Sequence, residues 1–115
     1  MPSLRGTFLC ALSCALGLMA QSSFARELSV VASFSILADM VSEIGGEAIE
    51  VESIVGPDAD AHVYQPSAAD AIAVARADVV FVNGLGFETW SSKLISESAS
   101  SAVVVVATEG VRPID

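Results

Sequence analysis

Cysteine is scarce in this chain of 115 residues, and its two copies, Cys10 and Cys14, both lie in an apolar N-terminal stretch. Residues 26–115 contain none. That part of the chain therefore has no disulfide and no thiol nucleophile, which excludes disulfide-stapled folds and cysteine hydrolases. It must be stabilised by an apolar core, and its length suffices for one modest domain.

Positive charge is also scarce: 5 Lys and Arg stand against 14 Asp and Glu, for a formal net charge of −9. Such a surface repels phosphate backbones and anionic lipids, so we expect no nucleic-acid partner and no membrane-surface role. It concentrates cations locally. Acidic surfaces serve plain solubility equally well, so the charge is a bias toward cation binding and not a proof of it.

The chain has no apolar run long enough to span a bilayer comfortably. A basic residue, Arg5, precedes a short apolar stretch from Thr7 to Ala20, and Ser23 and Ala25 form a small-x-small cleavage site. We expect residues 1–25 to be a cleavable signal peptide and the product to be periplasmic. A lipid anchor is disfavoured because both cysteines lie inside the apolar stretch.

The hydrophobic period alternates between strand and helix along residues 26–115. Strands are predicted at Leu28–Ser33, Ile49–Val55, Asp78–Asn83 and Ala102–Ala107. A first helix carries apolar residues at helical spacing, with Ser35 as its N-cap and Gly45-Gly46 as its end. A second helix is predicted from Ser67 to Ala77. Ser67 and Asp70, three residues apart, suggest a capping box at its start. A third surrounds Trp90, Leu94 and Ile95.

Continuous β-branched runs in the last two strands, including the four valines at 103–106, predict burial on both faces. Such strands belong to parallel sheets that helices cover, so the predicted fold class is α/β. Loops beyond the carboxyl ends of parallel strands line the binding crevice of such folds. The segment around His62 and the turn at Asn83-Gly84 both follow strands, so the two loops could face one cleft.

His62 is the only histidine. Imidazole is a common ligand of transition metals, and Asp58 and Asp60 add negative charge beside it, although a lone loop histidine is also often an ordinary surface residue. The two aspartates fit turn formation best, with hydrogen bonding to the ring as a second role and direct binding of the ion as a third. Tyr64 fits either a hydrogen bond near the site or packing beneath the loop.

The segments DADAHVYQPSAAD and ARADVVFVNGLGFETW resemble the N-terminal lobe of TroA-like solute-binding proteins of bacterial zinc and manganese ABC importers. The pattern Asp-x-His-x-Tyr-x-Pro precedes a helix, and an Ala-Asp strand is followed by Asn-Gly and a Glu-x-Trp pair. The matching residues are Asp60, His62, Tyr64, Pro66, Asp70, Ala77, Asp78, Asn83, Gly84, Glu88 and Trp90.

The resemblance implies that residues 26–115 are the N-terminal lobe of a two-lobed receptor and that His62 is its first metal ligand. The cofactor implied is a zinc ion, with manganese as the alternative. The implied partners are the divalent ion and a permease of the inner membrane, and the protein would be a monomer. The family's other ligands, connecting helix and second lobe have no counterpart before Asp115, so a fragment is expected.

Competing functions fit the residues less well. Gly84 and Gly86 follow a strand as a dinucleotide-binding turn would, but Thr89 stands where a third glycine or alanine is needed, and the turn follows the third strand and not the first. A hydrolase using His62 as a base lacks a Gly-x-Ser-x-Gly setting. An adhesin role has no physical basis in these residues. Glu88 fits a helix N-terminus and Trp90 a core position, so both are interpreted as structural.

Overall fold

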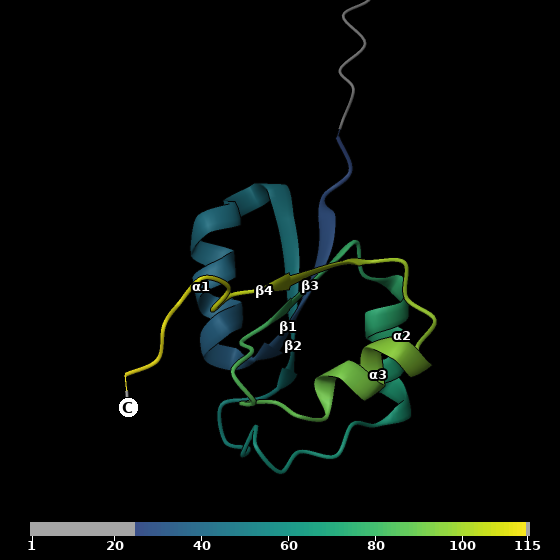
Figure 1. The fold of residues 1–115 in the computed structure, drawn as a ribbon. Helices are drawn as coiled ribbons and strands as arrows, with labels where there is room; N and C mark the ends of the chain where they lie inside the picture. The colour runs from purple at the N-terminus through teal and green to yellow at the C-terminus, as the bar shows by residue number, and fades with distance from the viewer. Residues whose placement is uncertain (1–24, 115) are drawn as a thin grey trace, which may run out of the picture.

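The structure, a computed structural model, describes residues 25–114. The predicted signal peptide at 1–25 therefore lies outside the described residues except for Ala25. Four parallel strands form one sheet in the order β2-β1-β3-β4, confirming the α/β class (Figure 1). The strands are β1 (Leu28–Phe34), β2 (Ile49–Val55), β3 (Val79–Val82) and β4 (Val103–Val106). The helices are α1 (Ser35–Gly45), α2 (Ala68–Arg76) and α3 (Ser91–Glu97), with a short 3-10 turn at Gly46–Ala48.

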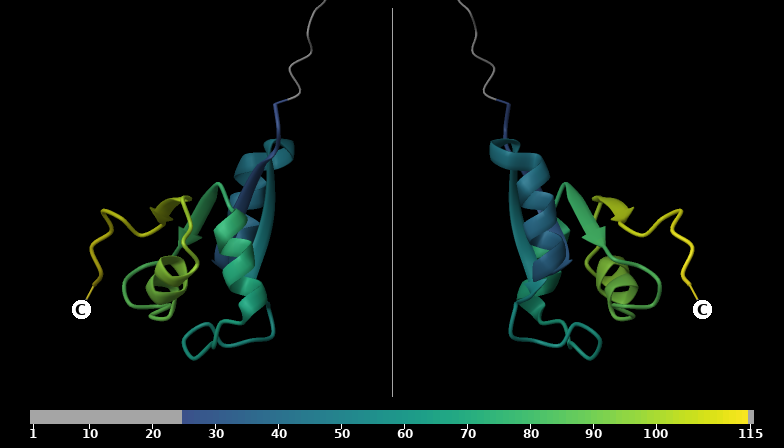
Figure 2. Two further views of the ribbon diagram at one scale, coloured as in Figure 1. Left: turned by 90° about the vertical axis from the view of Figure 1, so that its right-hand side faces the viewer. Right: turned by 90° about the vertical axis from the view of Figure 1, so that its left-hand side faces the viewer.

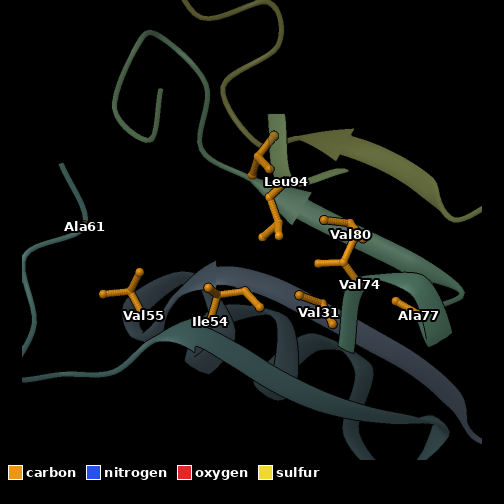
Figure 3. Close-up of a cluster of buried hydrophobic side chains, with 9 residues drawn as sticks. Val31, Ile54, Val55, Ala61, Val74, Ala77, Val80 and Leu94 are labelled. Carbon is orange, nitrogen blue, oxygen red and sulfur yellow. The ribbon is translucent and has the colours of Figure 1, made fainter. Parts of the chain in front are cut away.

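Helices cover both faces of the sheet. The side chains of β1 alternate between the two faces, so each face receives apolar residues that a helix can cover. Val30 and Ala32 pack with residues of α1, whereas Val31 belongs to a second cluster with α2 and α3. Figure 3 shows this second cluster, in which Val74 of α2 and Leu94 of α3 lie against the strand residues. Both helix contacts are thoroughly buried, with Val74 only 1% exposed.

Helix ends follow the predictions at three of the four predicted positions. Ser67 caps α2 through a full capping box with Asp70, and the helix ends at Arg76, one residue before the predicted end. Gly46 ends α1 with a φ of 52°, a conformation that glycine adopts without strain. The prediction of Ser35 as an N-cap is wrong. The strand runs directly into the helix, so extended Phe34 occupies the cap position and Ser35 is already helical.

The expected burial of the fourth strand on both faces is wrong. β4 lies at the edge of the sheet, and Val103, Val104 and Val106 are 64, 44 and 38% exposed. α1 packs mainly on β1 and β2, at the opposite side of the sheet from β4. The valine run therefore reflects strand propensity and pairing with β3, and not enclosure between two layers.

An ion pair fixes the start of β1 to β3 through Asp78, the residue before β3. Arg26 donates to one carboxylate oxygen at 2.8 Å, and the backbone N–H of Ser29 donates to the other at 2.8 Å. These hydrogen bonds hold the pKa of Asp78 below its ordinary value, and the one from Arg26 has the larger effect. The Ala-Asp pair of the sequence pattern thus has a structural role at the amino end of the sheet.

Candidate functional site

The strand order reverses between β1 and β3, because the chain passes from β1 to β2 on one side and returns to β3 on the other. In open parallel sheets, ligands bind beyond the carboxyl ends of the strands at such a reversal. The loops that follow β2 and β3 both lie at this end of the sheet, the lower end in Figure 1 and Figure 2. The carboxyl end of the sheet is therefore the expected position of a ligand site.

His62 lies in the loop between β2 and α2, with its side chain 62% exposed. Its backbone N–H donates to Asp60 Oδ1 at 2.9 Å, and its ring Nδ1 lies 3.5 Å from the same oxygen. The predicted turn-forming role of Asp60 is therefore present, and the carboxylate also lies beside the ring. Asp58 is exposed in the same loop and makes no hydrogen bond within the described residues.

Two phenylalanines place the His62 ring against the other loops. The rings of His62 and Phe87 meet edge to face with centroids 4.4 Å apart, and Phe87 lies 4.9 Å from Phe34 at the end of β1. The last residue of β1 and the loops that follow β2 and β3 are thus in contact, so the His62 loop lies beside the segment that follows Asn83. Sequence reasoning did not single out either phenylalanine. Their positions at the end of a strand and inside the glycine turn were the available signal.

Trp90 joins the loop of His62 to the start of α3. Its indole Nε1–H donates to the backbone carbonyl of Ala61 at 2.6 Å, and its ring packs against the core cluster. Tyr64 lies beside it, with ring centroids 5.4 Å apart, and its hydroxyl donates to Asp70 Oδ2 at 2.9 Å. That hydrogen bond raises the pKa of Tyr64 above its ordinary value of 10.0, with burial as a smaller cause. Both expected roles of Tyr64, packing and hydrogen bonding, are present.

Glu88 holds the glycine turn together. It is 5% exposed, and its Oε1 accepts the backbone N–H of Gly84 at 2.9 Å. The interpretation of Glu88 as a residue at a helix N-terminus is wrong, because α3 begins three residues later at Ser91. Gly84 has a φ of 83°, and a Cβ there would lie 2.6 Å from Val106 Cγ1. Packing against β4 therefore explains this glycine without a bound phosphate.

Within residues 25–114, no three His, Cys, Asp or Glu side chains come together as a group able to hold a metal ion. The described residues bring one imidazole and one carboxylate, those of His62 and Asp60, side by side. In the same range, no helix combines the length and apolar character that crossing a membrane requires.

Comparison with known proteins gives a consistent picture. Residues 30–115 match the family described as ZnuA, the periplasmic component A of the zinc-uptake complex. The chain is 36% identical over 93 residues to the iron-binding protein YfeA of Yersinia pestis, covering 81% of this chain and 30% of that protein. It is 42% identical over 80 residues to the manganese-binding lipoprotein MntA of Halalkalibacterium halodurans, covering 70% and 27%.

Among solved structures, the periplasmic zinc-binding protein TroA of Treponema pallidum superposes with a TM-score of 0.69 at 29% identity, covering 76% of this chain and 31% of that one. The chain thus spans about a third of the length of the relatives it matches.

Proposed function

The chain belongs to the ZnuA family of periplasmic zinc-uptake components, and we propose that it captures a divalent transition metal ion through His62 for delivery to an ABC permease of the inner membrane. The function is binding without catalysis, by a monomer in the periplasm. No nucleic acid takes part. Residues 26–115 act as the N-terminal lobe of the receptor.

The observation that carries the proposal is the position of the imidazole. His62 is exposed at the reversal of strand order, where α/β sheets bind ligands, and its ring leans on Phe87 from the neighbouring loop. Asp60 lies beside Nδ1, an arrangement in which a carboxylate orients a ligating histidine. Nε2 is then the nitrogen that binds the ion, in the neutral form of the ring.

Zinc is the ion we propose, with manganese as the alternative. The relatives carry the names of iron-, manganese- and zinc-binding proteins, so membership in the family leaves the metal open. Zinc accepts nitrogen ligands readily, whereas manganese favours sites rich in oxygen. The choice in a complete site depends on the remaining ligands, since residues 26–115 supply a single imidazole.

Titration calorimetry with zinc on this chain tests the ligand assignment. His62→Ala should weaken zinc binding at least about tenfold, because the only imidazole is lost. Asp58→Asn is the matched control: it removes a charge from the same loop and should change the affinity by less than about threefold. An unchanged dissociation constant for His62→Ala would show that the ion binds elsewhere.

Export is tested separately. Mass spectrometry of the protein recovered from the periplasm should give Arg26 as the first residue, because Ser23 and Ala25 form the cleavage site. A periplasmic product that still begins at Met1 would contradict the assignment of residues 1–25 as a cleaved signal peptide.

A further inference from the structure

We propose that Trp90 is a positioning residue for the metal ligand: its indole N–H holds the carbonyl of Ala61 and so fixes the backbone from which the His62 ring projects. The inference rests on the proposed role of His62 and adds to it a residue from a distant part of the chain.

The hydrogen bond is the link between the tip of the loop and the rest of the protein. Its partners are 29 positions apart in sequence and 2.6 Å apart in space. The other hydrogen bonds made by residues 57–63 in the described structure are local, from Ala59 to Gly56 and from His62 to Asp60. Without the indole donor, the loop tip would keep only its local hydrogen bonds and would have none to a distant part of the chain.

Burial changes sharply at the residue that Trp90 holds. Ala61 is 7% exposed and belongs to the core cluster, whereas the side chain of His62, one position later, is 62% exposed. A carbonyl at such a boundary needs a partner, because an unpaired buried acceptor is costly. The indole therefore sets the point at which the chain emerges from the core and presents the imidazole.

Trp90 is itself held firmly enough to serve this purpose. Trp90 directly precedes α3, and its ring packs against the core cluster and against Tyr64. Phe87, three residues earlier, contacts the His62 ring, and buried Glu88 between them is bonded to Gly84. The segment from Phe87 to Trp90 thus contacts both the backbone before His62 and the ring of His62.

A ligand held in place before the ion arrives binds more tightly, because less conformational entropy is lost on binding. Loss of the indole donor should therefore lower metal affinity even in a fully folded protein. A residue that only stabilises the core would lower the melting temperature and leave the affinity of the folded protein unchanged.

The sharpest variant replaces Trp90 by 3-benzothienylalanine, which keeps the shape of the ring and has sulfur where the indole has N–H. Zinc titrations run well below the melting temperature should show binding about 3- to 10-fold weaker, the equivalent of one hydrogen bond. In the metal-free protein, ¹⁵N relaxation should show a more mobile backbone N–H at His62. Trp90→Phe should change both quantities in the same direction.

Ser100→Ala is the matched control. It also removes a side-chain donor from a distant backbone carbonyl, that of Val74 at 2.9 Å, but it leaves the His62 loop untouched. Its zinc affinity and His62 mobility should equal those of the wild type.

The outcomes separate the two proposals. If His62→Ala weakens zinc binding but the benzothienyl variant matches the wild type in affinity and mobility, Trp90 does not position the ligand. If His62→Ala has no effect, the proposed function fails, and the mobility of the His62 backbone in the metal-free variant alone decides whether Trp90 holds the loop.

Discussion

One carboxylate oxygen, Asp70 Oδ2, gathers three donors at the entrance to α2. The hydroxyl of Tyr64 donates at 2.9 Å, and the backbone N–H and hydroxyl of Ser67 donate at 2.7 and 2.9 Å. Hydrogen bonds to an ionised acceptor are stronger than neutral ones. This residue therefore joins the end of the His62 loop to the first turn of the helix that follows it.

Tyr64 is the only tyrosine, so its ionisation can be followed by ultraviolet absorbance. Its pKa should lie above 10.0 in the folded protein, because the neutral phenol donates to Asp70. The resulting stabilisation is fully present below about pH 10, the ordinary pKa of tyrosine, and is lost as the pH rises through the folded value. Asp70→Asn should lower the Tyr64 pKa toward 10.0. An unchanged titration in a folded variant would contradict this assignment.

The histidine could be found from the sequence because only one is present and it follows a strand. The rings that meet it could not, since the contacts of Phe34 and Phe87 depend on how three strands come together. The hydrogen bond from Trp90 to Ala61 also depends on the tertiary arrangement and could not be found from the sequence. Sequence reasoning placed Trp90 in the core but gave no reason to pair its indole with one particular carbonyl.

At the level of helices and strands, period and turn residues predicted the four strands, α1 and α2 to within two residues at their ends, and they placed α3 without bounds. The bounds of Ile49–Val55 agree fully, and Glu50 and Glu52 are exposed as alternation requires. The errors arose where neighbours decide the outcome. Ser35 is a good capping residue, but no connecting residue separates β1 from α1. The valines of β4 suit a buried strand, but their position at the sheet edge leaves them exposed.

The capping box of α2 can be tested at this level. Ser67→Ala removes the side chain that accepts the backbone N–H of Asp70 and should reduce the free energy of unfolding by about 1 kcal/mol. Ser92→Ala, at an exposed position within α3, is the control and should change it by less than about 0.5 kcal/mol. Urea unfolding measures both. Equal stabilities of the two variants would show that the cap contributes nothing.

For the molecule as a whole, topology brings three separate sequence segments into contact. Phe34 ends β1, His62 follows β2 and Phe87 follows β3, and the parallel arrangement brings all three to one edge of the sheet. The formal net charge of −9 favours cations over anions around the protein. The core clusters on both faces of the sheet hold these ends in place.

The number of available ligands limits how tightly this chain can bind zinc. With one histidine and no cysteine, residues 26–115 offer fewer strong ligands than the three or four of a tight transition-metal site. Asp60 is 64% exposed, and holding it against an ion would cost chain entropy. We therefore expect zinc to bind this chain with a dissociation constant of about micromolar or weaker.

The most direct test of metal binding by His62 is ¹⁵N NMR of its ring during a zinc titration of the ¹⁵N-histidine-labelled chain. One imidazole in the sequence makes the assignment unambiguous. The Nε2 resonance should move to a metal-bound position as zinc is added, while Nδ1, beside Asp60, keeps its proton. Zinc binding with both ring nitrogens unchanged would show that His62 is not the metal ligand.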